Sequence, residues 1–154
     1  MVKRIIWAGP YRLRDLLDRV PEVDDDGLPR SGPKTPPEGN SAYLVTAHDW
    51  LGQPSAASTV LYVGGNTGAS KRFRTRIGDL VADACGFFGW WTGHHSGGQA
   101  LFRWCSEKGV SPLDLHIAWV TNRTCPRCAE VELYNTFGVD ALNRKRPSSC
   151  QEHH

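Results

Sequence analysis

The stretch LYVGGNTGASKRFRTRIGDLV, residues 61–81, joins a strand-like run, a glycine pair and a helical pattern. Its apolar start predicts a short strand that ends around Tyr62, and the glycines at 64–65 predict a tight turn. Beyond the turn, apolar residues recur at helical spacing and predict one buried stripe of Phe73, Ile77, Leu80, Val81 and Ala84. Arg72 and Arg76 lie four residues apart, so their side chains project together beside this stripe. A tyrosine hydroxyl facing two guanidiniums suits a phosphate better than an apolar core.

Two β-prone runs, at 43–46 and 59–63, flank a loop that contains glycine and proline, as a long hairpin connection would. Antiparallel pairing of these runs places Tyr43 and Tyr62 on neighbouring strands. Taken alone, the two could be ordinary sheet tyrosines whose hydroxyls reach the surface.

Periodicity and punctuating residues indicate the remaining elements. They predict helices at 11–20, 99–108 and 124–138, strands at 4–8 and 115–120, and a proline- and glycine-rich loop at 21–40. Thr124 is the expected N-cap of the last helix, and Gly138 ends it.

A chain of 154 residues can form one domain with its own core. The pattern predicts the α/β (α+β) class, with a small three-stranded, mainly antiparallel sheet flanked by helices. We divide the chain into an N-terminal strand–helix extension with its loop (1–39), a core domain (40–148) and a C-terminal tail (149–154).

Five features, in this order, resemble the motifs of the GIY-YIG nuclease family. They are Ser41-Ala42-Tyr43, Tyr62-Val63-Gly64, Arg72 ten residues after Tyr62, Glu130 in the helical AEVELYNTF, and the pair Leu142-Asn143. The resemblance covers residues 40–148, and it implies a GIY-YIG-like fold with nuclease activity. Glu132 also lies off the apolar stripe of its helix and is expected to be an ordinary solvated carboxylate.

The resemblance implies divalent-metal-dependent hydrolysis of phosphodiester bonds in DNA, expected to be double-stranded. Arg72, alone or with Arg76, would bind the scissile phosphate, because guanidinium geometry matches phosphate oxygens. Glu130 would hold one Mg²⁺ or Mn²⁺, hard ions that prefer carboxylate and water. Tyr43 or Tyr62 would activate the water, provided that nearby cations or the metal lower its pKa.

One position departs from the family. In many relatives a histidine or tyrosine follows the arginine by four residues and helps to activate the water. Here that residue is Arg76, which cannot act as a base. His94 or His95, in the glycine-rich segment 86–98, could replace it, and a histidine without a role is the equal alternative. Asn143 would orient its neighbours through hydrogen bonds.

The formal net charge of +2 gives no overall sign of a nucleic-acid-binding protein. Local basic runs are more informative, because such side chains bind phosphates without regard to sequence. The expected nucleic-acid contacts are Lys71, Arg74, Arg144, Lys145 and Arg146. A solvated surface is the alternative for both runs.

The N-terminal residues show no signal-peptide pattern and no apolar run of membrane length, so we expect a cytoplasmic protein that does not contact membranes. In that compartment the five cysteines would be thiols or metal ligands rather than disulfides. Two donor pairs, Cys125 with Cys128 and Cys150 with His153, have the spacing usual in structural Zn²⁺ sites. Free thiols are the alternative, and His153 could belong to an expression tag.

Three functions stay open on the sequence. The first is a stand-alone endonuclease of the restriction or phage type, active as a monomer or a homodimer. The second is a catalytically inactive domain of the same fold that binds nucleic acid. The third is a zinc-stabilised interaction module, in which Tyr43, Tyr62 and Arg72 are incidental.

Overall fold

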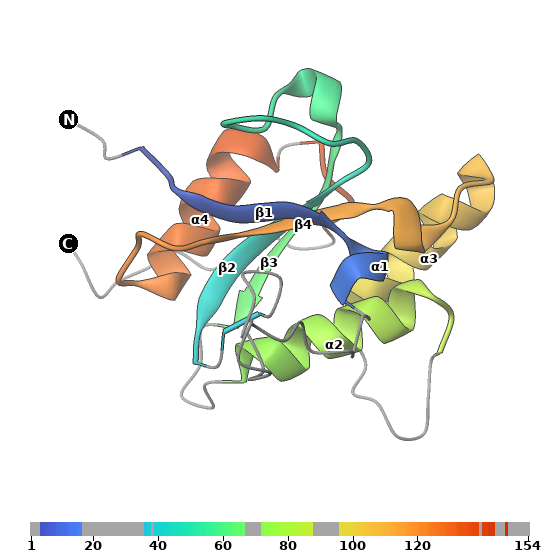
Figure 1. Ribbon diagram of the computed structural model, residues 1–154, viewed down its shortest axis with the longest axis horizontal. Coiled ribbons are helices and arrows are strands. Elements are labelled where there is room, and N and C mark those ends of the chain that lie inside the picture. The colour runs from blue at the N-terminus through green and yellow to red at the C-terminus, as the bar shows by residue number, and fades with distance from the viewer. Residues whose placement is uncertain are drawn as a thin grey trace, which may run out of the picture.

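The computed structural model describes residues 4–16, 36–37, 39–66, 72–87, 96–138, 140–143 and 147. Within these ranges the chain forms a four-stranded antiparallel sheet in the order β1-β4-β2-β3 (Figure 1). The strands are β1 Trp7–Arg12, β2 Ser41–Thr46, β3 Val60–Asn66 and β4 His116–Val120. The predicted mixture of helices and antiparallel sheet is confirmed, whereas the predicted number of three strands is wrong.

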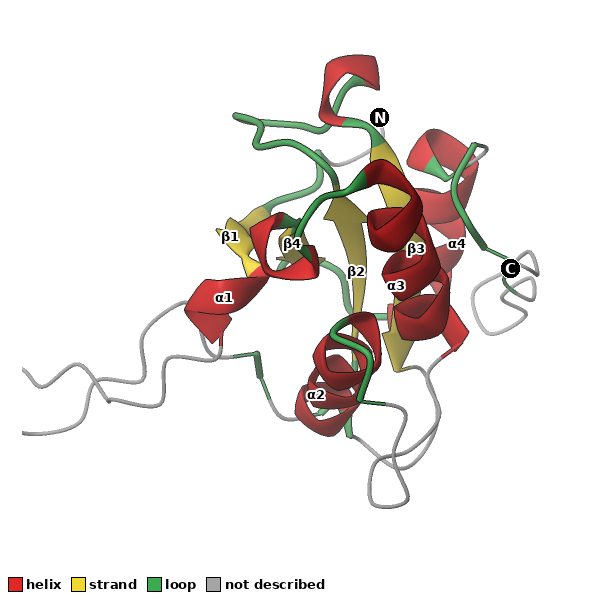
Figure 2. Ribbon diagram, turned by 90° about the vertical axis from the view of Figure 1, so that its right-hand side faces the viewer, coloured by secondary structure: helices red, strands yellow, loops and turns green. Residues whose placement is uncertain are grey.

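The described helices lie on both sides of this sheet (Figures 1 and 2). They are α1 Leu13–Leu16, α2 Phe73–Ala84, α3 Ser96–Lys108 and α4 Pro126–Phe137, with 3-10 turns at Ala56–Ser58 and Pro112–Asp114. The stripe predicted for α2 is confirmed, because all five of its apolar side chains are buried. No described helix has the length and apolar character that crossing a membrane requires.

Two apolar clusters sandwich the sheet. One contains Tyr43 and Val45 of β2 and is covered by α2 and α3. The other contains Ala42 and Leu44 of β2 and is covered by α4. Alternate side chains of β2 point to opposite faces, so all six residues of this strand are buried.

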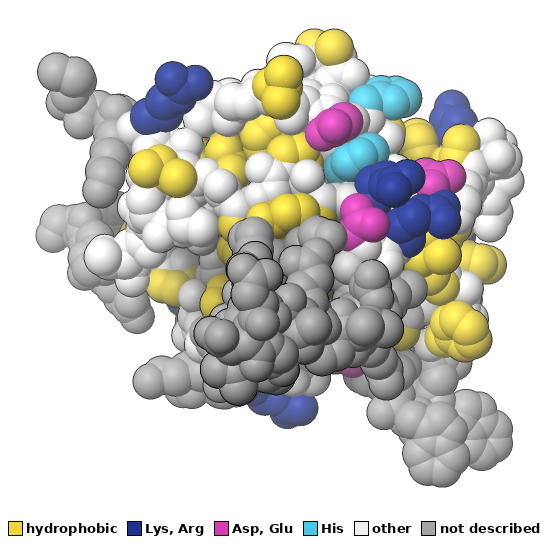
Figure 3. Space-filling view, in the orientation of Figure 1, with side chains coloured by type: hydrophobic (Ala, Val, Ile, Leu, Met, Phe, Trp, Pro, Cys, Tyr) yellow, Lys and Arg dark blue, Asp and Glu magenta, His cyan; other side chains and the backbone are white. Residues whose placement is uncertain are grey.

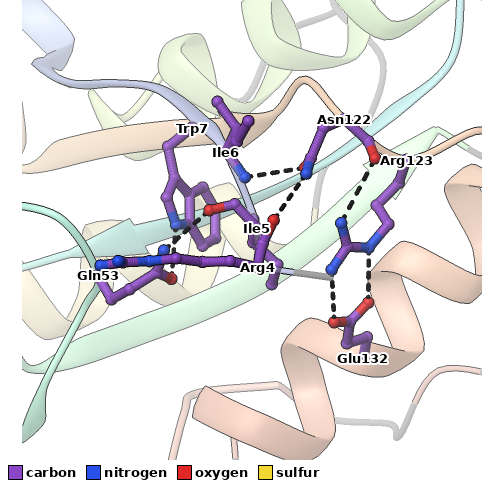
Figure 4. Close-up of polar contacts among 8 residues, drawn as sticks. All are labelled: Arg4, Ile5, Ile6, Trp7, Gln53, Asn122, Arg123 and Glu132. Atoms are coloured by element: carbon purple, nitrogen blue, oxygen red, sulfur yellow. Dashed lines mark hydrogen bonds and ion pairs between the residues drawn. The ribbon is translucent and has the colours of Figure 1, made fainter. Parts of the chain in front are cut away.

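The additional strand is β1, which belongs to the stretch expected as an N-terminal extension and pairs with β4. It runs from residue 7 to 12, so the strand predicted at 4–8 exists with its bounds shifted, and residues 11–12, predicted as helix, belong to it. Pro10 is tolerated because the register shifts between Ala8 and Tyr11 and because β1 is an edge strand in the sheet that the structure describes. The chain before β1 is held by side-chain amides (Figure 4). Asn122 bonds the backbone of Arg4 and Ile6, and Gln53 bonds Ile5 and Trp7.

The glycine pair at 64–65 lies inside β3, opposite Tyr43 and Ala42 of β2, so the predicted turn is wrong. α3 begins at Ser96, three residues before the predicted start. A Cβ on Gly98 would lie 2.6 Å from Cβ of Asp83 and 2.8 Å from the carbonyl oxygen of Leu80. The backbone of α3 therefore packs directly on α2. At α4 the N-cap is Cys125 rather than Thr124.

Gly98→Ala should lower the free energy of unfolding by about 1–3 kcal/mol, because the new methyl group overlaps α2. Gly78→Ala is the matched control on an exposed position of α2, where a Cβ meets nothing within 4 Å. That control should raise stability by roughly 0.5–1 kcal/mol, since alanine favours helix. Urea denaturation followed by circular dichroism measures both. Equal effects of the two substitutions would contradict the close packing of α2 and α3.

Candidate active site

Two tyrosine rings lie side by side on the face that α2 and α3 cover. The ring centroids of Tyr43 on β2 and Tyr62 on β3 are 6.2 Å apart, with the ring planes tilted by 39°. Tyr43 is completely buried, whereas Tyr62 is partly exposed. The predicted pairing of the two strands is confirmed, although Tyr43 stands opposite Gly64 and Tyr62 stands opposite Val45.

Gly64 makes this arrangement possible. A Cβ at this position would lie 2.7 Å from Oη of Tyr43 and 2.8 Å from Cε1 of Tyr62. Contacts this short are excluded, so a side chain at residue 64 would displace one or both rings. The glycine is needed for close approach rather than for a turn.

Arg76 and Glu130 join the tyrosines from two helices. Arg76 of α2 interacts electrostatically with both phenols and with Glu130 of α4. Glu130 approaches the same edge of the sheet from the opposite face. A Cβ on Gly65 would lie 3.3 Å from Oε2 of Glu130, so the glycine leaves room for the carboxylate. Side chains from β2, β3, α2 and α4 thus act on one another electrostatically.

Burial dominates the ionisation of the two phenols. It raises the pKa of Tyr43 well above its usual value, and the charges of Tyr62 and Glu130 add to the increase while Arg76 opposes it. Burial also raises the pKa of Tyr62. There Arg76 and a hydrogen bond with Ser96 act in the opposite direction. Both phenols are therefore protonated near neutral pH, and either would need additional positive charge to act as a base.

Among the described residues named at this place, Glu130 is the carboxylate that could hold a metal. Burial raises its pKa, and the positive charges of Arg127 and then Arg76 partly offset that effect. Among the described residues, no three His, Cys, Asp or Glu side chains lie close enough together to hold an ion. Mg²⁺ is often bound by one or two carboxylates, with water and substrate phosphate completing its shell. A single glutamate fits that mode and does not fit a metal site made entirely of protein ligands.

Arg72 lies one turn before Arg76, at the N-cap position of α2. Its side chain is exposed, and within the described ranges it takes no part in the interactions that join Arg76 to the tyrosines. Its backbone forms an isolated bridge with Gly39. Of the two arginines, Arg76 is therefore the better candidate for binding a phosphate beside the tyrosines. Arg72 lies on the adjoining surface.

Asn143 bonds the strand that carries Tyr62. Its Nδ2 donates to the carbonyl oxygen of Val63 at 2.7 Å, and its Oδ1 accepts from the Val63 N–H at 3.1 Å. Beside it, the N–H of Leu142 donates to the carbonyl oxygen of Leu61 at 2.7 Å. Together these bonds occupy the outer edge of β3, so Asn143 orients the strand rather than a substrate.

Glu132 is not the solvated carboxylate that the sequence indicated. Arg123 donates to both of its oxygens, Nε to Oε2 at 3.1 Å and Nη2 to Oε1 at 3.0 Å (Figure 4). Both side chains are mostly covered, with 17% and 31% of their surfaces exposed. This two-pronged pair occupies Glu132 and distinguishes it from Glu130, two residues earlier on the same helix.

One described cysteine does not have the chemistry expected of it, whereas Cys85, Cys105 and Cys125 are thiols as expected. Cys128 is disulfide-bonded, so the prediction that it is a thiol or a metal ligand is wrong for this residue. Zinc binds thiolates, which a disulfide sulfur cannot supply. Cys125 is a buried thiol that accepts from the Cys128 N–H at 3.4 Å and so caps α4. The remaining candidates, Cys150 and His153, lie outside the described residues.

Several other predicted site residues also lie outside the described ranges. They are His94, His95, Lys71, Arg144, Lys145 and Arg146. Arg74 is described and exposed on α2, and its Nε donates to the carbonyl oxygen of Pro36 at 2.7 Å. The face in Figure 3 carries acidic, basic and histidine side chains intermixed at its right-hand side, so the described part of this face has no continuous basic band.

Sequence reasoning missed Ser96 and Arg127, which both act on the ionisable groups of this site. The glycine-rich segment 86–98 includes Ser96 and hides its role, although serine before a helical pattern is an ordinary helix-start signal. Arg127 precedes Glu130 by three residues and belongs to no recognisable motif; it acts on the glutamate because the first turn of α4 places residues three apart on one side.

Comparison with protein-family models, with curated proteins and with solved structures finds no match for this chain. The family resemblance of its short motifs is thus an untested prediction.

Asn143→Ala should release the outer edge of β3 because it removes both side-chain bonds to Val63. We expect a loss of about 1–3 kcal/mol in stability and faster exchange of the Val63 amide hydrogen. Thr136→Ala, at an exposed position on α4, is the control and should cause neither. Amide hydrogen exchange followed by NMR makes the measurement. Unchanged protection of Val63 would show that the bonds to Asn143 do not hold the strand.

Proposed function

We propose that this protein is a divalent-metal-dependent phosphodiesterase that cleaves DNA. The observation that supports it most is the meeting of Arg76, Tyr43, Tyr62 and Glu130, which come from four elements and share one electrostatic environment. A cation for phosphate, a phenol for proton transfer and a carboxylate for a metal are the groups that such a hydrolysis needs.

In this proposal the guanidinium of Arg76 binds the scissile phosphate. It lies beside the phenols, and its planar donors match two phosphate oxygens. Arg72, one turn away and exposed, would hold the adjoining part of the nucleic-acid backbone. The two arginines together extend the positive surface from the reacting phosphate to its neighbour.

The reaction consumes one water molecule. The water oxygen forms a bond to phosphorus, and the bond from phosphorus to one sugar oxygen breaks. The proton of the water passes to an ionised phenol, and the leaving oxygen takes a proton from solvent. The products are a phosphomonoester and an alcohol. Asn143 supports the step indirectly, because it fixes the backbone that follows Tyr62.

Glu130 would hold the metal with one carboxylate, and water and phosphate would complete the shell. Bound Mg²⁺ or Mn²⁺ supplies positive charge that stabilises the developing charge on the phosphate and favours an ionised phenol. Without a bound metal ion, the negative charge of Glu130 adds to burial in raising the pKa of both tyrosines, and this opposes ionisation of either phenol. Metal dependence is thus an expected property of this charge arrangement.

A catalytically inactive nucleic-acid-binding domain is the second candidate. It is favoured by the burial of Tyr43, by the raised pKa of both phenols, and by Arg76 at a position where relatives of the resembled family have a base. The zinc-stabilised interaction module is less well supported, since Cys128 is disulfide-bonded. A stand-alone restriction or phage-type enzyme, its subunit number and its cytoplasmic location remain parts of the proposal.

Glu130→Gln should abolish nearly all Mg²⁺-dependent nicking of a supercoiled plasmid, because the substitution removes the metal-binding charge and keeps the side-chain size. Binding of DNA should persist, since a negative charge beside the phosphate is lost. Glu132→Gln is the matched control on the same helix. It should retain cleavage and instead lose stability, because Arg123 would lose its charged partner.

Plasmid nicking, gel shift and melting temperature on the same preparations separate these effects. Wild-type nicking by a folded Glu130→Gln protein would contradict the metal assignment. DNA binding without nicking by the wild-type protein would favour the inactive domain.

Mn²⁺ binding should weaken on acidification at a higher pH than for an ordinary glutamate, because burial raises the pKa of Glu130 and protons compete with the ion. Arg127→Gln removes a charge that lowers this pKa, so the loss of binding should move to still higher pH. Arg103→Gln, exposed on α3, is the charge-matched control and should leave the pH dependence unchanged. Electron paramagnetic resonance of free Mn²⁺ across pH measures the effect. An identical pH dependence in wild type and Arg127→Gln would contradict binding at Glu130.

A further inference from the structure

We propose that Ser96, the first residue of α3, is a positioning residue that holds the hydroxyl of Tyr62 and makes Tyr62, rather than Tyr43, the tyrosine that exchanges a proton with the attacking water. The inference rests on the proposed phosphodiesterase function for its catalytic part. The positioning itself is a property of the fold and can be tested without cleavage.

The hydroxyl end of Tyr62 lies against the first turn of α3. A Cβ on Gly97 would lie 2.4 Å from Cζ of Tyr62, and 2.6 and 2.7 Å from its two Cε atoms. Only a residue without a side chain lets the helix backbone come this close to the ring. Gly97 therefore brings its neighbour Ser96 to the phenol, and the two form a hydrogen bond.

The start of α3 is itself fixed. Gly98 packs its backbone on Asp83 and Leu80 of α2, the helix that also carries Arg76. Ser96 and Arg76 therefore approach Tyr62 from two helices that are locked together. The Ser96-Gly97-Gly98 sequence is explained by these contacts: one residue bonds the phenol, one admits its ring and one admits α2.

The surroundings of Tyr62 favour its ionised form more than those of Tyr43 do. Burial raises the pKa of Tyr62, the Arg76 charge and the Ser96 hydrogen bond lower it, and the Glu130 charge acts with burial. The N-terminal end of α3, a helix of 13 residues, adds a partial positive charge next to the ring. Tyr43 is completely buried, with the ring of Phe73 packed against it. Tyr62 is also the ring with solvent access.

The experiment places 3,5-difluorotyrosine at position 62 and follows its ionisation by ¹⁹F NMR. Fluorine lowers the phenol pKa, so the labelled residue ionises at a pH at which the protein is still folded. Ser96→Ala should raise the midpoint by about one pH unit, the effect of losing a hydrogen bond to a charged group. Ser96→Thr keeps the hydroxyl and should restore a midpoint near that of wild type. The same label at Tyr11, on β1, is the control and should not respond.

Cleavage rates at a pH below the midpoint test the catalytic part. Ser96→Ala in the unlabelled protein should lower kcat by about tenfold with an unchanged KM for DNA, and Ser96→Thr should recover most of it. Ser96 is exposed, so Ser96→Ala should remain folded, with melting temperature as the check.

An unchanged midpoint in Ser96→Ala would overturn the positioning role, whether or not the protein cleaves DNA. A shifted midpoint with active wild-type enzyme but an unchanged kcat would overturn the choice of Tyr62 as the proton acceptor. If Ser96→Ala shifts the midpoint but the wild-type protein cuts no DNA, the positioning role is supported and the phosphodiesterase proposal is refuted.

Discussion

The close approach of Tyr43 to the backbone of Gly64 is the constraint on which the candidate site depends. Because residue 64 has no Cβ, the buried ring of Tyr43 and the ring of Tyr62 can both occupy the space above β3. The next residue, Gly65, leaves the opposite face open to Glu130. Two consecutive glycines in an edge strand thus let groups from both faces of the sheet meet. A larger residue at either position would separate the phenols from the carboxylate.

The same burial that packs these groups makes them poor anions. The pKa values of Tyr43, Tyr62 and Glu130 are all raised, with desolvation as the first cause. Arg76 interacts with all three groups, and its positive charge partly offsets the free-energy cost of ionising them in apolar surroundings. Perturbed ionisable groups of this kind gather at functional sites more often than elsewhere, although structural networks also produce them. A bound cation or phosphate would change the balance among these four residues, and the fold places them ready to respond.

Glu130 and Glu132 lie two residues apart on α4 and have different partners. Glu132 faces Arg123 and is held in a two-pronged ion pair, whereas Glu130 lies beside Gly65 and acts on the phenols through its charge. Along the outer edge of β3, the side-chain amide of Asn143 makes the hydrogen bonds that the backbone of a further strand would make. The strand that carries Tyr62 is therefore braced on its outer edge by Asn143 and at its ring by the start of α3.

The sequence by itself determined the amphipathic stripe of α2, the neighbouring strands of Tyr43 and Tyr62, and the helix that carries Glu130, because these follow from local periodicity. Only the tertiary structure decided that β1 is a fourth strand, since its partners in β4 lie far away in the chain. It also decided that Gly64 serves close packing rather than a turn, and that Ser96-Gly97-Gly98 is helical. Glycine permits a turn and a close contact equally well, and which of the two it serves depends on what another segment brings beside it.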